Sequence, residues 1–234
     1  MPPGLIRPER GFRSAMRESG RTKTILVVFS FLLASILATG GIIEDTCPVT
    51  TRFFPLNRPG FKDPRTFADT AYRTAVTYFN AHLSQIRNRR FLTIIDYTKP
   101  SFTRRLYLID LDSYRVERYY VAHGKNSGYV YANRFSNDID SYMSSRGFFL
   151  TGREFYGSHG VCLVLHGLEK GVNDKAMERG IVLHGAEYIT PAAILLNGGR
   201  LGRSLGCPAV SMEAIDKIVG KIKRGSLLYI HTAS

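Results

Sequence analysis

The stretch Arg203-Ser204-Leu205-Gly206-Cys207-Pro208-Ala209-Val210 holds one cysteine between a glycine and a proline, directly before a predicted helix. Upstream, the apolar run Ile181-Val182-Leu183-His184-Gly185-Ala186 is typical of a strand and carries a histidine near its end. A thiolate is a strong nucleophile, and a neighbouring imidazole takes its proton and later returns it to a leaving group. We therefore interpret Cys207 as the nucleophile and His184 as the base of a cysteine acyl-transfer enzyme.

Backbone amides beside the cysteine are the expected oxyanion donors. Proline has no N–H, so Pro208 is excluded and the amides of Gly206 and Cys207 are the candidates. Four further residues are expected to line the site: Ser204, Gly185, His159 and Arg203.

Each of these residues also has a structural interpretation. Ser204 fits ordinary turn chemistry as well as positioning of the catalytic pair. Arg203 either binds a substrate carboxylate bidentately or is a solvated loop charge. His159 is the weaker candidate for the cleft wall. Two other histidines that precede a glycine, His123 and His166, are interpreted as structural.

The chain has 234 residues, and from Arg90 onward it reads as short apolar or aromatic runs separated by turn residues. The spacing of apolar residues predicts one amphipathic helix over Pro64–Ile86 and another over Met212–Lys223, begun by Ser211. The predicted fold class is mainly β with flanking helices, an α+β domain. Its strands are predicted at Phe91–Tyr97, Arg105–Leu111, Arg115–Ala122, Gly147–Thr151, Val161–Leu165, Gly180–His184 and Ser226–His231.

The N-terminal part resembles an export signal. A basic segment, residues 1–23, precedes an apolar one, residues 24–43, that is about as long as a membrane span. This order of charge predicts a cytoplasmic N-terminus and an exported remainder, with a cleaved signal peptide and an inner-membrane anchor as alternatives. Residues 44–89 are expected to form a linker and a helix, and residues 90–234 the catalytic domain in the periplasm or cell envelope.

The charge balance indicates polyanionic partners. The chain carries 32 Lys and Arg against 19 Asp and Glu, a formal +13. Anionic lipid and bacterial cell wall fit such a surface. Nucleic acid fits the charge but not an exported chain.

Three cysteines leave one odd thiol in an exported protein. Cys47 and Cys162 either pair in an oxidising compartment or stay reduced, and Cys207 remains free in both cases. There is no C-x-x-C spacing, so a structural zinc site is not expected. A zinc peptidase built on His159 and His166 is also disfavoured, because seven residues along a strand put the two side chains on opposite faces.

The segments His184-Gly185-Ala186 and Ser204-Leu205-Gly206-Cys207 resemble the active-site signature of bacterial L,D-transpeptidases, the YkuD-type catalytic domain. The likeness is closest to the murein L,D-transpeptidase branch. It extends over residues 90–232 through shorter motifs: Val121-Ala122-His123-Gly124, Asn126-Ser127-Gly128, Phe135-Ser136-Asn137, Gly147-Phe148, Thr151-Gly152, His159-Gly160, Gly167-Leu168-Glu169 and Asn173-Asp174.

This resemblance implies a β-sandwich or barrel-like fold, and the roles of nucleophile and base for Cys207 and His184. It implies attack on the diaminopimelate carbonyl of a peptidoglycan tetrapeptide stem, loss of D-alanine, and a thioester resolved by an amine from a second stem. No metal or other cofactor is implied.

The chain departs from the family signature at three places. Leu205 stands where the signature has histidine, Pro208-Ala209-Val210 occupies the place of an arginine or asparagine, and the spacer from His184 to Ser204 is longer. The acceptor therefore stays open among a stem amine, a protein amine, a free D-amino acid and water. With water the same residues make an L,D-carboxypeptidase, and a non-catalytic wall-binding domain is the remaining alternative. The oligomeric state is open.

Overall fold

The computed structural model describes residues 69–158 and 160–233. Most of their regular secondary structure is β-strand. The elements in chain order are α1 (Asp69–Ala81), β1 (Phe91–Asp96), β2 (Leu106–Asp110), β3 (Val116–Tyr119), β4 (Gly147–Gly157), β5 (Gly160–Gly167), β6 (Val182–Gly185), α2 (Pro191–Leu196), β7 (Ala209–Val210), α3 (Met212–Ile222) and β8 (Leu227–His231). Residues 1–43, Cys47, the start of the predicted first helix and His159 lie outside the described residues. Within the described ranges, no helix is both long and apolar enough to cross a bilayer.

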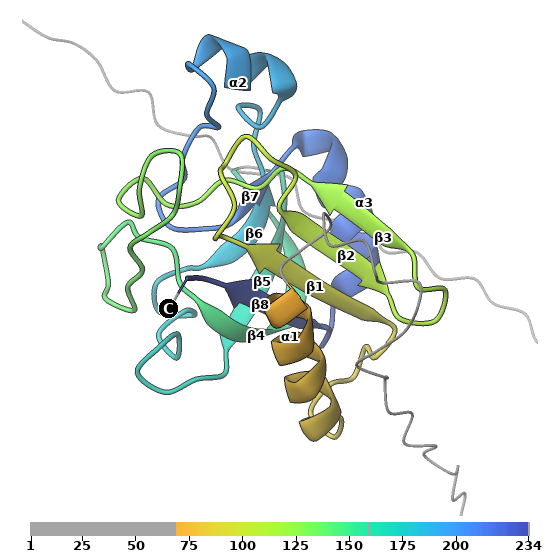
Figure 1. The fold of residues 1–234 in the computed structure, drawn as a ribbon. Helices are drawn as coiled ribbons and strands as arrows, with labels where there is room; N and C mark the ends of the chain where they lie inside the picture. Colours follow the sequence, from red (N-terminus) through yellow and green to blue (C-terminus); the bar gives the residue numbers. More distant parts are fainter. Residues whose placement is uncertain (1–68, 159, 234) are drawn as a thin grey trace, which may run out of the picture. The chain divides into compact units, whose positions relative to one another are not determined.

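All eight of these strands join one sheet in the order β3-β2-β1-β8-β4-β5-β6-β7 (Figure 1). β1 and β8 run parallel, as do β6 and β7, and the other neighbours are antiparallel. The two ends of this order approach each other, because Ala122, shortly after β3, bridges to Ala209 in β7. The amide of Ala122 donates to the Ala209 carbonyl at 2.8 Å. The sheet is therefore nearly closed into a barrel, and the predicted fold class is confirmed.

The helix α3 packs its apolar stripe against one side of the sheet. Its buried residues recur at helical spacing and contact β5, β6 and β1: Ala214, Ile215, Ile218, Val219 and Ile222. They share a core with Leu163 of β5, Leu183 of β6 and Leu228 of β8. This core holds the strands that carry the predicted site.

The helix α1 covers the opposite side of β1. Leu92 and Ile94 pack in one cluster with Ala75 and Phe79 of α1, while Ile95 belongs to the core beneath α3. Because side chains alternate along a strand, β1 is covered on both faces, which explains why four of its six residues are apolar and all but Phe91 are buried.

The largest differences between the prediction and the structure are in four elements. α1 ends at Ala81 rather than Ile86, although Leu83 and Ile86 stay buried in the cluster around the helix and so prolong its apolar spacing. β4 continues past Thr151 to Gly157 through a register shift between Thr151 and Glu154, which interrupts the apolar alternation. The helix α2 and the two-residue strand β7 were not predicted. α2 begins with Thr190 as a cap, whose side chain accepts from the Ala193 amide.

Candidate active site

The predicted base lies on β6, and the predicted nucleophile lies two residues before β7, the strand that runs parallel to β6. His184 in β6 is the Cα partner of Ala209 in β7, and its amide donates to the Pro208 carbonyl at 3.3 Å. The sulfur of Cys207 lies against the start of β6: it accepts from the Val182 amide at 3.5 Å. The pairing of β6 with β7 thus brings two residues together that are separated by 23 positions in the sequence.

The imidazole of His184 is buried and oriented by the chain itself. Its Nδ1 lies 2.8 Å from the carbonyl oxygen of Gly185. A carbonyl only accepts hydrogen bonds, so in the neutral ring the proton is on Nδ1 and the lone pair on Nε2. The base nitrogen of the predicted pair is therefore Nε2.

Cys207 ends a tight turn, which we call the Ser204–Cys207 turn. Ser204 Oγ donates to the carbonyl of Cys207 at 2.5 Å and accepts from the Gly206 amide at 3.1 Å. Gly206 has φ +124°, and a Cβ there would lie 2.9 Å from the Met143 carbonyl oxygen. Glycine is therefore required at this position by both conformation and space.

The turn is fixed on a second loop that begins at His123. The Ser204 amide donates to the His123 carbonyl at 3.0 Å, and the Lys125 amide donates to the Ser204 carbonyl at 2.8 Å. His123 is fully buried, with Nδ1 2.7 Å from Arg105 Nη2 and Nε2 3.2 Å from the Gly128 carbonyl. Burial and the Arg105 cation lower the pKa of His123 to about 4. His123 is accordingly a neutral, structural histidine, as the sequence predicted.

One charged residue near the site was missed by sequence reasoning. Arg179 donates from Nη2 to the Met143 carbonyl at 2.6 Å and from Nη1 to Ser145 Oγ at 2.6 Å. A Cβ on Gly206 would lie 3.6 Å from the same Nη2, so the guanidinium sits directly behind the Ser204–Cys207 turn. Its partners come from a loop far away in the sequence, and no motif surrounds it, so no sequence signal identified it.

The environment of the Cys207 thiol disfavours ionisation. Burial raises the pKa of Cys207, whereas the Val182 amide and the Arg179 charge lower it. Cys162 also raises the pKa of Cys207, by more than Arg179 lowers it, and this second thiol is the Cα partner of His184 across β5 and β6. Both Cys162 and Cys207 carry free thiols. A half-buried thiol with a raised pKa needs a base to become a nucleophile.

Arg203 and Gly185 have structural roles in addition to the predicted ones. Arg203 Nη1 donates to the Lys125 carbonyl at 2.7 Å, and its guanidinium lies 4.4 Å from the centre of the Tyr129 ring. At Gly185 the space of a Cβ is already occupied, because the Met212 Sδ of α3 would lie only 2.7 Å from it.

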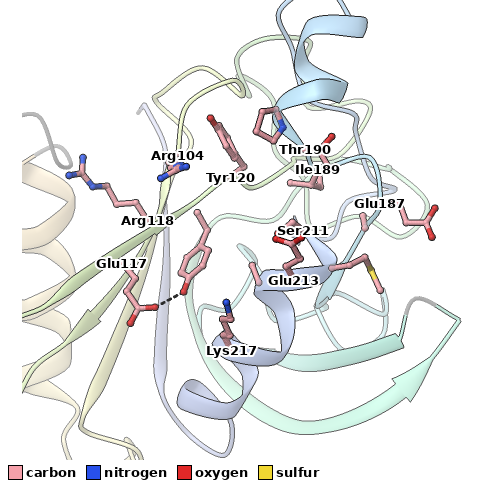
Figure 2. Close-up of a pocket in the computed structure, with 15 residues that line it drawn as sticks. Arg104, Glu117, Arg118, Tyr120, Glu187, Ile189, Thr190, Ser211, Glu213 and Lys217 are labelled. Carbon is pink, nitrogen blue, oxygen red and sulfur yellow. Dashed lines mark hydrogen bonds between the residues drawn. The ribbon is translucent and has the colours of Figure 1, made fainter.

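A cavity of about 720 Å³ lies beyond the C-terminal ends of β6 and β7, and we call it the charged cavity (Figure 2). It begins at Ala186, two residues after His184, and extends to α3 and β3. Its walls carry both signs of charge: Arg104, Arg118 and Lys217 with Glu117, Glu187 and Glu213. Cys207 and His184 do not line it. A mixed charge of this kind suits a ligand that carries both carboxylate and ammonium groups.

The sequence profile of the L,D-transpeptidase catalytic domain matches residues 64–231. The chain belongs to this family. The resemblance identified from the two segments around His184 and Cys207 is thereby confirmed. The matched range of this L,D-transpeptidase-family protein includes α1 as well as the barrel. Members of the family act on the stem peptides of peptidoglycan in the cell envelope.

Several solved structures resemble the chain at low identity. An L,D-transpeptidase from Mycobacterium smegmatis is 13% identical with a TM-score of 0.37, covering 61% of this chain and 59% of that one. A variant of the helical cell shape determining protein Pgp2 from Campylobacter jejuni is 15% identical with a TM-score of 0.40, covering 64% and 49%. L,D-transpeptidase 3 from Mycobacterium tuberculosis, in complex with a faropenem-derived adduct, is 10% identical with a TM-score of 0.41, covering 61% and 60%.

The chain covers less than two thirds of the length of each of these solved chains. No curated protein sequence matches it significantly.

Proposed function

We propose that this protein is a cysteine acyltransferase that exchanges an amide bond of peptidoglycan stem peptides through a thioester on Cys207, as an L,D-transpeptidase. One observation carries the proposal: the Ser204–Cys207 turn leads directly into β7, which pairs with β6, the strand of His184, and the Cys207 sulfur accepts from the Val182 amide of that strand. The family membership of the chain supports the substrate class.

In the proposed reaction His184 Nε2 takes the proton from the sulfur of Cys207. The thiolate attacks the carbonyl of the diaminopimelate residue that precedes the terminal D-alanine. The tetrahedral intermediate collapses, the amine of D-alanine leaves with the proton from His184, and a thioester remains. An amine of a second stem then attacks the thioester, passes its proton to His184 and restores the thiol. One amide is exchanged for another, so no ATP is needed.

The pKa values around Cys207 support a general-base step. Burial raises the pKa of Cys207, so the thiol is largely protonated at neutral pH and gains from a base. Arg179 and the Val182 amide lower the pKa of Cys207 and would stabilise the thiolate once formed. Base catalysis of this kind typically contributes about 10²–10⁴ in rate.

The proposed oxyanion donors are the amides of Gly206 and Cys207. The Gly206 amide bonds to Ser204 Oγ in the free protein, so it would have to exchange this partner for the substrate oxygen. The Cys207 amide follows the positive φ of Gly206 and is the donor to which we assign the larger share. Ser204, Gly185, His159 and Arg203 complete the proposed surroundings of the substrate.

The charged cavity is the proposed place for the part of the stem peptide beyond the reacting carbonyl. Its volume of about 720 Å³ falls in the range of small-molecule sites. The cavity begins two residues from His184, and its paired charges suit a peptide that carries carboxylates and an amine.

We further propose that the chain is exported. Residues 1–23 would be cytoplasmic, residues 24–43 a signal peptide or inner-membrane anchor, and residues 44–89 a linker and helix before the catalytic part at 90–234. The domain would then act in the periplasm or cell envelope.

One observation favours hydrolysis as the second candidate function. Leu205 stands at the signature's histidine position and is 63% exposed beside the thiol, so the acceptor side lacks a polar side chain there. With water as acceptor, the same thioester makes the protein an L,D-carboxypeptidase.

Mass spectrometry of the reaction products distinguishes these functions. The purified full chain is incubated in mild detergent with disaccharide-tetrapeptide, alongside Cys207→Ala and His184→Gln variants. Crosslinked dimers that disappear in both variants are expected for a transpeptidase, and free tripeptide without dimers would identify a carboxypeptidase. Unchanged substrate, with no acyl adduct on Cys207, would contradict the catalytic proposal and leave a wall-binding domain.

A further inference from the structure

The helix α2 presents two leucines to solvent. Leu195 is 81% exposed and Leu196 is 87% exposed, and no residue of α2 is buried. α2 projects from the barrel at the top of Figure 1, away from the strands of the sheet. Two adjacent aliphatic side chains on a projecting element are an unusual feature for a soluble surface, because single scattered ones are the norm.

Arg200 and Arg203 follow these leucines in the sequence, and both lie against the ring of Tyr129. Arg200, just after α2, lies 5.1 Å above the ring of Tyr129, and Arg203 lies 4.4 Å from the same ring. Tyr129 is 61% exposed and Tyr131 is 53% exposed. Hydrogen bonds from Arg203 Nη1 to the Lys125 and Gly128 carbonyls hold the two loops together. We call this surface the α2 face: Leu195, Leu196, Arg200, Lys125, Tyr129 and Tyr131.

The segments that build the α2 face carry no acidic residue. Residues 120–137 and 188–212 contain no Asp or Glu, and their charged side chains are all basic: Lys125, Arg134, Arg200 and Arg203. Of the acids that directly flank these segments, Glu187 and Glu213 line the charged cavity, and Asp138 accepts from the hydroxyl of Ser136. The α2 face therefore complements an anionic partner.

The leucines distinguish between the anionic partners that a basic face could bind. An acidic wall polymer or a nucleic acid pairs with arginine and lysine but offers no hydrocarbon for an aliphatic side chain. A lipid leaflet offers both: acyl chains for leucine, and phosphates for arginine at the level where tyrosine is also favoured.

We infer that the α2 face is a membrane-contact surface, in which Leu195 and Leu196 enter an anionic leaflet and Arg200 and Lys125 bind its headgroups. Such contact would set the Ser204–Cys207 turn close to the bilayer, because the Lys125 amide donates to the Ser204 carbonyl and Arg203 packs on Tyr129 of the α2 face. The inference does not depend on the proposed reaction.

The absence of tryptophan from the sequence allows a direct test. A Leu196→Trp variant of the full chain carries a single fluorescent reporter on α2. A matched Tyr156→Trp variant carries it on β4, at a residue that is 84% exposed and outside the α2 face. Both are mixed with vesicles of phosphatidylcholine and phosphatidylglycerol whose acyl chains are brominated. We expect a blue shift and at least threefold stronger quenching for Leu196→Trp than for Tyr156→Trp, weakened by adding Arg200→Glu or 0.5 M salt (~4 Å Debye length).

Both variants contain every other segment of the chain, so attachment to the vesicle elsewhere affects them equally. Equal emission and equal quenching in the two variants would overturn the inference. Equal quenching of Leu196→Trp in purely zwitterionic vesicles would also overturn it, since the anionic lipid would then be irrelevant. A blue-shifted emission before vesicles are added would overturn it as well, because the chain itself or a second copy would then cover the leucines.

Discussion

The hydroxyl of Ser204 donates to the carbonyl oxygen of Cys207 at 2.5 Å, so that a single side chain closes the turn that carries the thiol. The hydroxyl oxygen of Ser204 also accepts from the Gly206 amide, and the backbone N–H and C=O of Ser204 are both bonded to the loop that starts at His123. The position of the thiol is thus set by hydrogen bonds within four residues and by one loop from elsewhere in the barrel.

Removal of this hydroxyl should impair catalysis more than stability. In Ser204→Ala the Cys207 carbonyl and the Gly206 amide lose their shared partner, and we expect kcat/KM on disaccharide-tetrapeptide to fall about 10–100-fold, the equivalent of about 1–3 kcal/mol. Ser226→Ala is the matched control, because Ser226 Oγ makes a similar buried bond to the Phe91 carbonyl at 2.7 Å, away from the thiol. A similar loss of activity in both variants would contradict a specific role for Ser204.

Arg179 should lower the pKa of Cys207 through its charge. In Arg179→Gln this charge is lost, so the pKa of Cys207 should rise and the pH profile of alkylation should move to higher pH. The measurement is the rate of iodoacetamide labelling of the Cys207 peptide between pH 6 and pH 10 (roughly the range of thiol ionisation). Ser145→Ala removes one hydrogen bond of Arg179 but not its charge, and should leave the profile in place. An unchanged profile in Arg179→Gln would show that the charge does not reach the sulfur.

Sequence patterns predicted the elements that are buried and apolar or that carry a regular apolar stripe. β1, β2 and β8 are buried and apolar, and α3 has a regular stripe that ends near Ile222, so their bounds agree with the structure to within about two residues. α2 was missed although Thr190-Pro191 is a good helix start, because none of its residues is buried and no apolar stripe marks it.

The site could be predicted from the sequence only in part. Cys207 and His184 are distinctive as residue types beside glycine, and the structure brings their segments together. Arg179 and Arg105 could not be found this way, because most of their partners are backbone carbonyls that only the folded chain supplies. The residues of the α2 face could not be identified from the sequence either, because only the structure shows that their side chains are exposed.

Protonation of His123 should destabilise the fold at acidic pH. Its pKa in the folded protein is about 4, below the ordinary 6.5 of the unfolded chain. Between these two values the unfolded state binds a proton that the folded state does not, so stability falls as the pH drops from 6.5 to about 4 and then levels off. The whole loss corresponds to about 3 kcal/mol.

Urea unfolding of the wild type and of His123→Gln at pH 7 and pH 4.5 measures this pH-dependent contribution of His123 to the free energy of unfolding. Glutamine keeps an acceptor and a donor but does not titrate, so the difference in unfolding free energy between the two proteins should shrink at pH 4.5. His231, whose pKa is also lowered by burial, and the carboxylates titrate in both proteins and cancel in the comparison. A difference that is independent of pH would show that His123 does not stay neutral in the fold.

The lack of a side chain at Gly185 should be required by the packing of α3, in addition to the proposed place of this residue beside the substrate. A Cβ at this position would lie 2.7 Å from Met212 Sδ and 3.0 Å from Ile215 Cγ2. Met212 is 41% exposed and can move, whereas Ile215 is buried in the core, so Gly185→Ala should cost about 1–3 kcal/mol of unfolding free energy. Met212→Ala removes one of the two contacts, and the double variant should therefore lose less stability than the sum of the single ones. If Gly185 made room only for the stem peptide, Gly185→Ala would raise KM with little change in the unfolding midpoint, and Met212→Ala would not compensate.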